Sequence, residues 1–199
     1  FRDGACYNVI VKPGPLYPLN SIMHHGMVLG TKFQAERVSK GEDGKQDNRD
    51  LKNDARIYFG SGANLQELYL TPSMMDKKAW DDIADGARWA RRFQDILADV
   101  HWVGGNPWNK ETNEGAVYGW AAWNKNKATL ALRNSSDQEK SLTGTLRSIL
   151  DIPANVKGSI TFKDSYDDQR TLDGFSGSSV DIDKEISFTL KPFEVLVYE

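Results

Sequence analysis

The stretch Leu65–Asp99, LQELYLTPSMMDKKAWDDIADGARWARRFQDILAD, decides how the first half of this chain folds. It opens with an apolar run, Leu65–Leu70, which must end near Pro72 because proline has a fixed φ and no N–H to donate. Apolar residues then recur every three or four positions, as on the buried stripe of a helix: Trp80, Ile83, Ala84, Ala87, Ala90, Phe93 and Leu97. We therefore predict a buried strand, a turn and a helix over 77–98 with Asp76 as its N-cap, which together form one βα unit.

The residues before this unit are harder to assign. Asn20–Leu29 is predicted to be a short helix closed by a glycine, and Leu51–Phe59 another. Between them Thr31–Asn53 is mostly polar and is predicted to be a long exposed connection. Its Asp43 and Asp47 weakly resemble a calcium loop, but the glycine required at the sixth position is missing, so we expect no metal site.

After residue 103 the pattern changes to short runs with strand composition. Alternate residues are apolar in the Glu185–Leu190 run, which is the period of a half-buried strand. The other predicted strands are Val117–Trp123, Ala128–Arg133, Lys140–Leu146, Ser159–Asp164, Ser179–Ile182 and Glu194–Tyr198, with a helical turn at Arg147–Leu150. Strands at this spacing indicate an antiparallel β-sandwich. The predicted fold class is therefore α/β followed by all-β, with domains at 1–103 and 104–199.

Composition excludes several classes of function. The net charge of −3 gives no basic surface for nucleic acid, so no nucleic-acid partner is expected. No apolar run reaches the length of a membrane span. Cys6 is the only cysteine among the 199 residues, which excludes an internal disulfide and a cysteine zinc site. No phosphate loop or other cofactor motif is present either, and we expect no cofactor.

Three segments carry a resemblance to a known family. LYPLNSIMHHG at Leu16–Gly26 resembles a segment near the end of the catalytic barrel in α-galactosidases and α-N-acetylgalactosaminidases. LQELYLTP, followed by the tryptophan-containing helix, looks like the last strand and helix of such a (β/α)8 barrel. VYGWAAWNKNKATLALRN and the ending LKPFEVLVYE are similar to the C-terminal β-sandwich of that group. The resemblance therefore implies the end of a barrel (1–103) plus a sandwich (104–199).

The resemblance also implies a retaining glycoside hydrolase acting on α-linked galactose or N-acetylgalactosamine glycans. Such enzymes need two carboxylates, a nucleophile and an acid/base, about 5–5.5 Å apart. Asp3, upstream of the YP segment, is the residue placed like the family's acid/base. The nucleophile is expected on an earlier barrel strand, so the partner of this chain would be the remaining N-terminal part of the barrel. Because the chain starts at Phe1, we expect a piece of a longer, extracellular or periplasmic enzyme that is inert alone.

Each candidate residue has a structural alternative. Asp3 could instead be a salt-bridged residue near the terminus, and Arg2 a surface residue rather than an anchor for substrate. His24 and His25 are placed at a helix start, where either could line a substrate pocket or be structural. Glu67 interrupts an apolar strand, so it must be paired or solvated; contact with sugar hydroxyls and a salt bridge to an arginine such as Arg56 are both open.

Trp102 and the functional class leave alternatives as well. Trp102 flanks a Gly-Gly-Asn-Pro loop, where its indole could stack on a sugar or, as we favour, pack between domains. Trp120 and Trp123 lie three apart in a strand, so one should be buried and the other partly accessible. The rival functions are a non-catalytic sugar-binding module and a structural domain that binds nothing.

Overall fold

The structure, a computed structural model, describes residues 2–29, 49–172 and 174–199. Its helical elements are α1 Arg2–Cys6, the π-helical η1 Tyr7–Val11, the 3-10 turns η2 Leu19–Ser21 and η3 Pro72–Met74, α3 Arg49–Gly60, α4 Lys77–Arg92, α5 Gln94–Leu97 and α6 Leu146–Ile149. Its strands are β1 Met27–Leu29, β2 Leu68–Leu70, β3 His101–Gly104, β4 Val117–Trp123, β5 Ala128–Asn134, β6 Lys140–Thr145, β7 Ser159–Thr161, β8 Ser179–Asp181, β9 Glu185–Leu190 and β10 Val195–Tyr198. The calcium-like loop at 43–54 falls largely outside the described residues.

The first part of the chain forms a β–α–β–α arrangement. Strands β1 and β2 pair in parallel, with Met27 opposite Leu68, and α3 lies between them in sequence before α4 follows. The helix predicted at residues 20–29 is wrong: only η2 is helical there, and the segment ends in β1. The Met27 N–H donates to the Glu67 carbonyl at 3.1 Å, a partner that local sequence does not reveal. The short helix predicted at Leu51–Phe59 is confirmed as α3.

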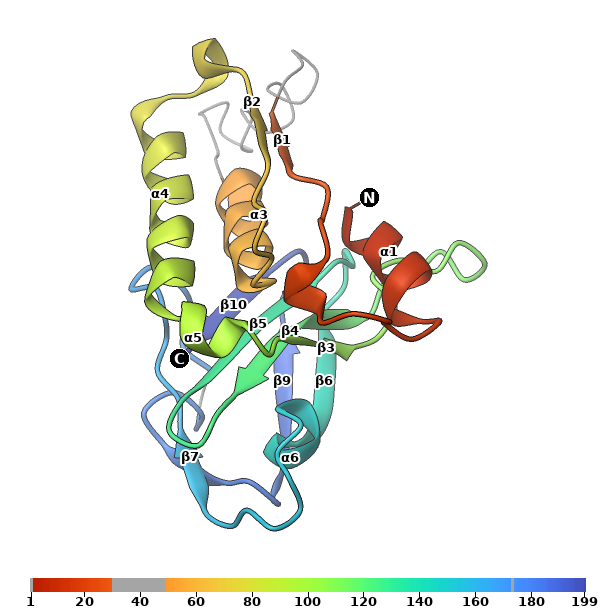
Figure 1. Cartoon of the computed structure of the whole chain (residues 1–199), viewed down its shortest axis with the longest axis vertical. Coiled ribbons are helices and arrows are strands. Elements are labelled where there is room, and N and C mark those ends of the chain that lie inside the picture. The colour runs from red at the N-terminus through yellow and green to blue at the C-terminus, as the bar shows by residue number, and fades with distance from the viewer. Residues whose placement is uncertain (1, 30–48, 173) are drawn as a thin grey trace.

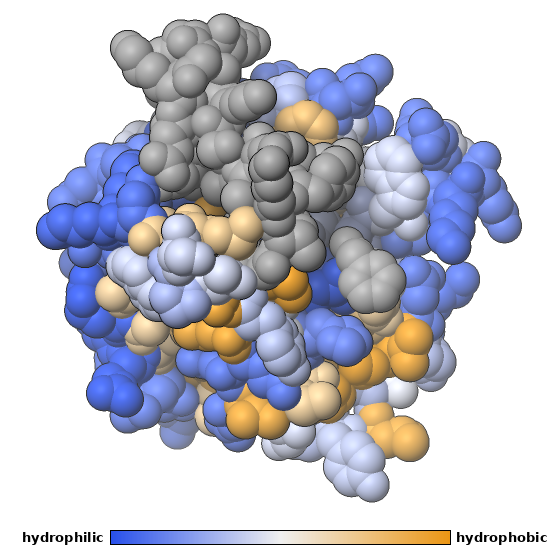
Figure 2. All heavy atoms as spheres, turned by 90° about the horizontal axis from the view of Figure 1, so that it is seen from above, coloured by the Kyte–Doolittle hydropathy of each residue, from blue (hydrophilic) through white to orange (hydrophobic). Residues whose placement is uncertain are grey.

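The apolar run at 65–70 is less buried than the sequence suggests. Its strand β2 begins only at Leu68, and Leu65, Leu68 and Tyr69 are 55%, 42% and 52% exposed. Val28 on β1 is 50% exposed as well. Seen from above in Figure 2, the molecule shows apolar patches among wide hydrophilic areas. The prediction of a buried strand is wrong for this segment, since two paired strands alone cannot cover their own side chains.

Helix α4 packs on α3 through the stripe that the sequence indicates, but the stripe is rotated. Asp76 caps α4 as predicted, with its side chain accepting from the Ala79 N–H at 2.7 Å. Trp80 is 42% exposed, whereas Trp89 is 3% exposed, so the burial expected of Trp80 is wrong. Gly86 explains the rotation: a Cβ there would lie 2.6 Å from the Phe59 ring, so glycine permits close contact between the two helices.

The predicted helix over 77–98 is also interrupted. Phe93, with φ −109° and ψ 15°, ends α4, and the short α5 continues from Gln94. Phe93 itself is 8% exposed, so the break keeps its ring in the core. Two helices at an angle therefore replace the single helix expected from periodicity.

The second part contains the antiparallel strands that the sequence predicts, most of them within a residue or two. One sheet has four strands in the order β10-β5-β4-β3, and two-stranded pairs form from β6 with β9 and from β7 with β8. The register pairs Tyr118 with Arg133 and Trp120 with Ala131. Strand β3 was not predicted. It spans the predicted domain boundary between 103 and 104 and pairs along its whole length with β4.

The four-stranded sheet is covered on both faces (Figure 1). On one face Trp120, Ala131 and Val197 pack in a core with α3, α4 and α5. On the other, Leu130, Leu132 and Leu196 pack in a second core with α6 and the paired strands. Among the described residues, no helix is long and apolar enough to cross a membrane. The helices and the antiparallel strands thus share one sheet as their common wall.

Candidate functional site

Charged and aromatic side chains from four elements meet beside the helix-covered face of the sheet. Arg2 and Asp3 come from α1 and Asp54 from α3. Tyr118 and Arg133 are direct cross-strand partners on β4 and β5, so they present their side chains on the same face. The fold therefore brings together residues that are up to 131 positions apart in a chain of 199.

Arg2 is the centre of an ion-pair network. Its Nε donates to Asp3 Oδ1 at 2.9 Å, and its two Nη atoms donate to the two Asp54 carboxylate oxygens at 2.9 and 3.3 Å. Arg133 Nη1 lies 3.3 Å from Asp54 Oδ1 and 3.8 Å from Asp3 Oδ2. The Tyr118 hydroxyl donates to Asp3 Oδ2. Each carboxylate is thereby shared between two arginines, a geometry that fixes α1 against α3 and the sheet.

The network sets the charge state of its members. Burial alone would raise the pKa of Asp3, but Arg2 and Arg133, with the Tyr118 hydrogen bond, hold that pKa below its usual value. Burial and the Asp3 charge raise the pKa of Tyr118 well above the ordinary value. Burial followed by the Asp3 charge raises the pKa of the Cys6 thiol to about 12. Asp3 is therefore an ionised carboxylate and Cys6 a protonated, buried thiol at neutral pH.

An aromatic wall connects this network to His24. The Trp102 ring stacks on Tyr118, with centroids 5.0 Å apart and an interplanar angle of 6°, and meets Trp120 edge-on at 5.0 Å. His24, 4% exposed, lies 5.2 Å from the Trp120 ring. Burial and the Arg2 charge lower the pKa of His24. Buried ring nitrogens of three of these residues lack a hydrogen-bond partner among the described residues: His24 Nε2, Trp102 Nε1 and Trp120 Nε1.

The remaining candidates are placed differently. Glu67 immediately precedes β2, so it lies at the amino end of that strand rather than the carboxyl end suggested by the sequence. Its carboxylate accepts from the Tyr69 hydroxyl at 2.8 Å, and its N–H donates to the Tyr58 hydroxyl at 2.7 Å. The alternative pairing with Arg56 is wrong, because Arg56 pairs with Asp168. His25 is exposed in the loop before β1, and the predicted helix start is absent there.

Five of the six predicted residues thus join one network of contacts. Arg2 and Asp3 bond directly, Trp102 and His24 connect through Tyr118 and Trp120, and Glu67 reaches Arg2 through Tyr58, whose ring lies 4.9 Å from the Arg2 guanidinium. The assignment of Trp102 to packing between the two parts of the chain agrees with this placement. The catalytic role predicted for Asp3 stays a prediction, although a lowered pKa suits a general acid poorly.

Sequence reasoning missed three members of the network: Asp54, Tyr118 and Arg133. Arg133 interrupts the apolar run ATLALRN of β5, the same signal that drew attention to Glu67 in β2. A buried charge in a strand needs a partner, so the signal was available. Asp54 gave no such signal, because it lies in a polar stretch of α3, where a carboxylate is normally interpreted as solvated.

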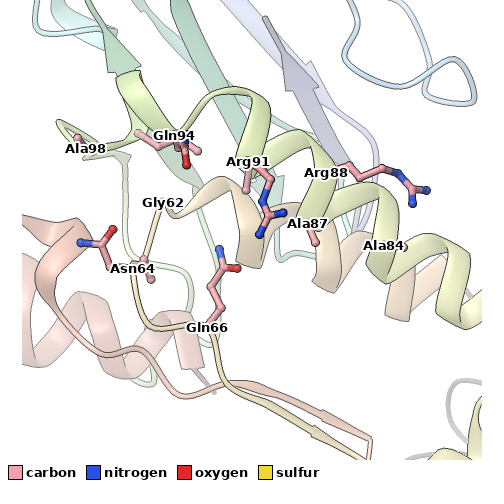
Figure 3. Close-up of a pocket in the computed structure, with 12 residues that line it drawn as sticks. Gly62, Asn64, Gln66, Ala84, Ala87, Arg88, Arg91, Gln94 and Ala98 are labelled. Carbon is pink, nitrogen blue, oxygen red and sulfur yellow. The ribbon is translucent and has the colours of Figure 1, made fainter.

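Two pockets adjoin these elements. A pocket of about 580 Å³ opens above the ion-pair network, between α1 and the loop that follows β3. A second pocket of about 550 Å³ lies between α4 and the segment before β2; Figure 3 shows Arg91 and Gln66 extending into it from opposite sides. None of the predicted site residues lines the second pocket. Chemistry that uses the predicted residues therefore belongs to the first.

Comparisons with known proteins give a likeness in structure. No family model and no curated protein matches the sequence. An α-galactosidase from Saccharomyces cerevisiae, solved with raffinose, matches 75% of this chain and 42% of its own with a TM-score of 0.51 and 9% identity. α-Galactosidase I from Mortierella vinacea matches 81% and 37% with a TM-score of 0.45 and 11% identity.

A candidate α-N-acetylgalactosaminidase from Bacillus halodurans matches 79% of this chain and 34% of its own, with a TM-score of 0.47 and 15% identity. The chain thus spans 34 to 42% of the length of these three structures. At such low identity the likeness concerns the fold alone, and the yeast structure is the one whose score supports it. By its fold, this chain resembles a part of an α-galactosidase.

Proposed function

We propose that this chain supplies the last βα units of the catalytic barrel and the β-sandwich of a retaining glycoside hydrolase acting on α-linked galactose or N-acetylgalactosamine glycans. The observation that carries the proposal is the order of elements: a parallel β1–β2 pair with α3 between them, then α4, then an antiparallel sheet docked on the helices. The likeness to the yeast α-galactosidase over 75% of this chain supports the same order.

The barrel geometry also predicts where substrate would bind. Barrel enzymes place their chemistry at the carboxyl ends of the parallel strands. Here β2 ends at Leu70 and leads into η3, at the top of Figure 1, whereas the Arg2–Asp3 network lies towards the amino ends. The network then serves to fix the sheet to the barrel, and substrate contacts come from the opposite end. This placement makes Asp3 a structural carboxylate, in competition with its predicted acid/base role.

A two-stranded parallel sheet does not make a barrel, so the proposal requires further βα units as the partner of this chain. Exposed apolar side chains on β1 and β2, Val28, Leu68 and Tyr69, support that requirement, because parallel sheets are normally covered on both faces. The nucleophile would lie in those units. An extracellular or periplasmic location is part of the proposal, as suits an enzyme for external glycans.

The test is hydrolysis of 4-nitrophenyl α-galactoside and 4-nitrophenyl α-N-acetylgalactosaminide. The isolated chain should give no turnover above the uncatalysed rate, whereas the chain joined to the barrel units that complete it should be active. The product anomer, followed by NMR, should retain the configuration of the substrate. Turnover by the isolated chain would contradict the partner requirement, and an inactive completed barrel would contradict the enzyme assignment.

The rival function is a non-catalytic sugar-binding module, and one observation favours it. Trp108, 43% exposed, lines the pocket above the ion-pair network, where an indole face is available to a ligand. Glycan binding by the isolated chain, with an inactive completed barrel, would establish this rival instead.

A further inference from the structure

The pocket above the ion-pair network has the dimensions of a small-ligand site. Its volume of about 580 Å³ falls within the range of about 300–1,000 Å³ that ligand pockets occupy. Its walls come from α1, from α3, from the loop after β3 and from β4 and β5. The lining residues that carry the argument are Arg2, Asp54, Trp108, Lys110, Tyr118 and Arg133.

The charges of this pocket do not cancel. Its lining holds three cations, Arg2, Lys110 and Arg133, against the two carboxylates of Asp3 and Asp54, which leaves a net charge of +1. Arg2 uses Nε and both Nη atoms on the two carboxylates. The surplus of positive charge therefore belongs to Arg133 and Lys110.

Neither of these two cations is saturated. Arg133 reaches the carboxylates through Nη1 alone, at 3.3 and 3.8 Å, and its side chain keeps 25% of its surface exposed. Lys110 is exposed and has no ion-pair partner among the residues that the structure describes. A guanidinium with free donors in a partly enclosed pocket is well suited to a carboxylate, since such charge-assisted hydrogen bonds are about twice as strong as neutral ones.

The third feature is an aromatic residue, Trp108, on a loop whose backbone is held by hydrogen bonds. The Trp108 backbone N–H donates to Asn106 Oδ1 at 3.1 Å, and the Asn106 carbonyl accepts from the Ala116 N–H at 3.0 Å. Ser135 on the other wall donates to the Pro107 carbonyl. These bonds fix the backbone of the loop before any ligand arrives, so the segment that carries Trp108 is preorganised.

We propose that this pocket binds a carboxylate-bearing pyranose, such as the hexuronate unit of an acidic glycan. The sugar carboxylate would pair with Arg133 and Lys110, and the apolar face of the ring would lie against Trp108. The proposed binding does not depend on glycosidase activity, because Arg133, Lys110 and Trp108 have no role in the proposed hydrolysis. Arg133 also helps to fix α1, which is a structural role. It adds a ligand class, acidic sugars, that the proposed substrates do not include.

The test is calorimetric titration of the isolated chain with galacturonate, with galactose and acetate as matched control ligands. Galacturonate should bind with a Kd of about 1 mM, as expected for a ligand of its size. Galactose lacks the carboxylate and acetate lacks the ring, so each should bind at least about tenfold more weakly. Raising the salt concentration from about 0.05 to 0.5 M should weaken galacturonate and leave galactose unchanged.

Two variants locate the site, and neither residue belongs to the ion-pair network. Trp108→Ala should reduce galacturonate affinity at least about tenfold, and Lys110→Gln about threefold to tenfold. Lys184→Gln, which removes an exposed lysine in the turn between β8 and β9, is the control and should bind as the parent chain does. Circular dichroism and the thermal midpoint should be unchanged in all three, since the side chains are exposed.

Four results would overturn the proposal. The first is equal affinity for galactose and galacturonate, which would make the site neutral; the second is equal affinity for acetate, which would make it a carboxylate site without sugar recognition. The third is the absence of heat from galacturonate at 50-fold the expected Kd, and the fourth is binding that survives Trp108→Ala. Each of these leaves the glycosidase proposal standing, because that proposal is judged by turnover.

Discussion

The two faces of the four-stranded sheet carry opposite chemistry. The face towards the paired strands is lined by Val117, Leu130 and Leu196 and packs against Phe162 and Phe188. The face towards the helices holds Trp120 and Ala131 but also Arg133, which pairs with carboxylates from α1 and α3. One face is therefore held mainly by apolar packing, and the other combines apolar contacts with a buried ion-pair network.

This contrast between the two faces shows how the two parts of the chain are held together. Apolar packing is tolerant of the exact partner, whereas an ion-pair network fixes orientation because each donor needs a particular acceptor. The chain uses the first between strands that follow one another in sequence. It uses the second where α1, at the start of the chain, must be fixed against β4 and β5.

The largest effect is expected on the apolar face. Phe188, 1% exposed, lies 4.7 Å from the Phe175 ring and 6.1 Å from the Tyr198 ring. Phe188→Ala should lower the free energy of unfolding by about 3–5 kcal/mol, because it leaves a cavity between the sheet and the paired strands. Urea unfolding followed by tryptophan fluorescence measures it.

Phe193 provides the control for this prediction. Its side chain is 52% exposed in the turn before β10, so Phe193→Ala should change the free energy of unfolding by no more than about 0.5 kcal/mol. Equal losses from the two variants would mean that the strand-covered face is not a packed core.

A smaller effect is expected on the helix-covered face. Asp3→Asn removes the charge that Arg2 and Arg133 share, although Arg2 keeps Asp54 as a partner. We expect a loss of about 2–3 kcal/mol, below the 3–5 kcal/mol of a buried pair left wholly unpaired. The measurement is again urea unfolding, at pH 7.

The matched control is a surface pair. Lys77 and Asp81 lie 2.6 Å apart on α4 with side chains 87% and 55% exposed, so Asp81→Asn should cost no more than about 0.5 kcal/mol. If Asp3→Asn lowered the free energy of unfolding no more than this control does, the ion-pair network would not contribute to holding α1 against the sheet. The contrast between the two faces would then be wrong.

The same contrast explains what the sequence could predict. The extents of β4 and β9 were predicted to the residue, β4 from its strand composition and β9 from the alternation of its apolar side chains, and both are local signals. Strand β1 was taken for a helix, because its three residues become a strand by pairing with residues 68–70. The predicted stripe includes Trp80, but the structure buries Trp89 instead, and which face of α4 is buried depends on where Phe59 meets Gly86.

For the candidate site as well, local signals could be predicted from the sequence and pairings between distant segments could not. Arg2, Asp3, His24 and Trp102 were chosen one by one from residue type and from a resemblance, and the structure brings them into one network. Their partners Asp54 and Arg133 could not be paired from sequence, because the pairing joins α3 to β5 across 79 positions. Local patterns therefore predict which faces are apolar, whereas the identity of ionic partners is fixed only when the chain has folded.

The smallest effect concerns His24, which is buried beside Trp120 on the helix-covered face. Burial and the Arg2 charge lower its pKa in the folded state, with Asp3 acting in the opposite direction. Above the unfolded pKa of about 6.5 both states are neutral and the stability is complete. As the pH falls through that value the unfolded chain takes up a proton first, so the free energy of unfolding should decline until the lower folded pKa is reached.

His24→Phe is the variant that isolates this term. It keeps a ring beside Trp120 and cannot titrate, and Nε2 has no partner among the described residues to lose. It also loses the hydrogen bond of His24 to the Leu19 backbone, so the comparison uses the slope of stability against pH rather than its absolute value. Urea unfolding of both proteins between pH 8 and pH 5 should show a steeper decline for the parent chain than for His24→Phe. Parallel curves would mean that His24 gains its proton as easily when folded as when unfolded. The helix-covered face would then be open to water near His24. In that case only the packing of α1 would bury Asp3 and its arginines.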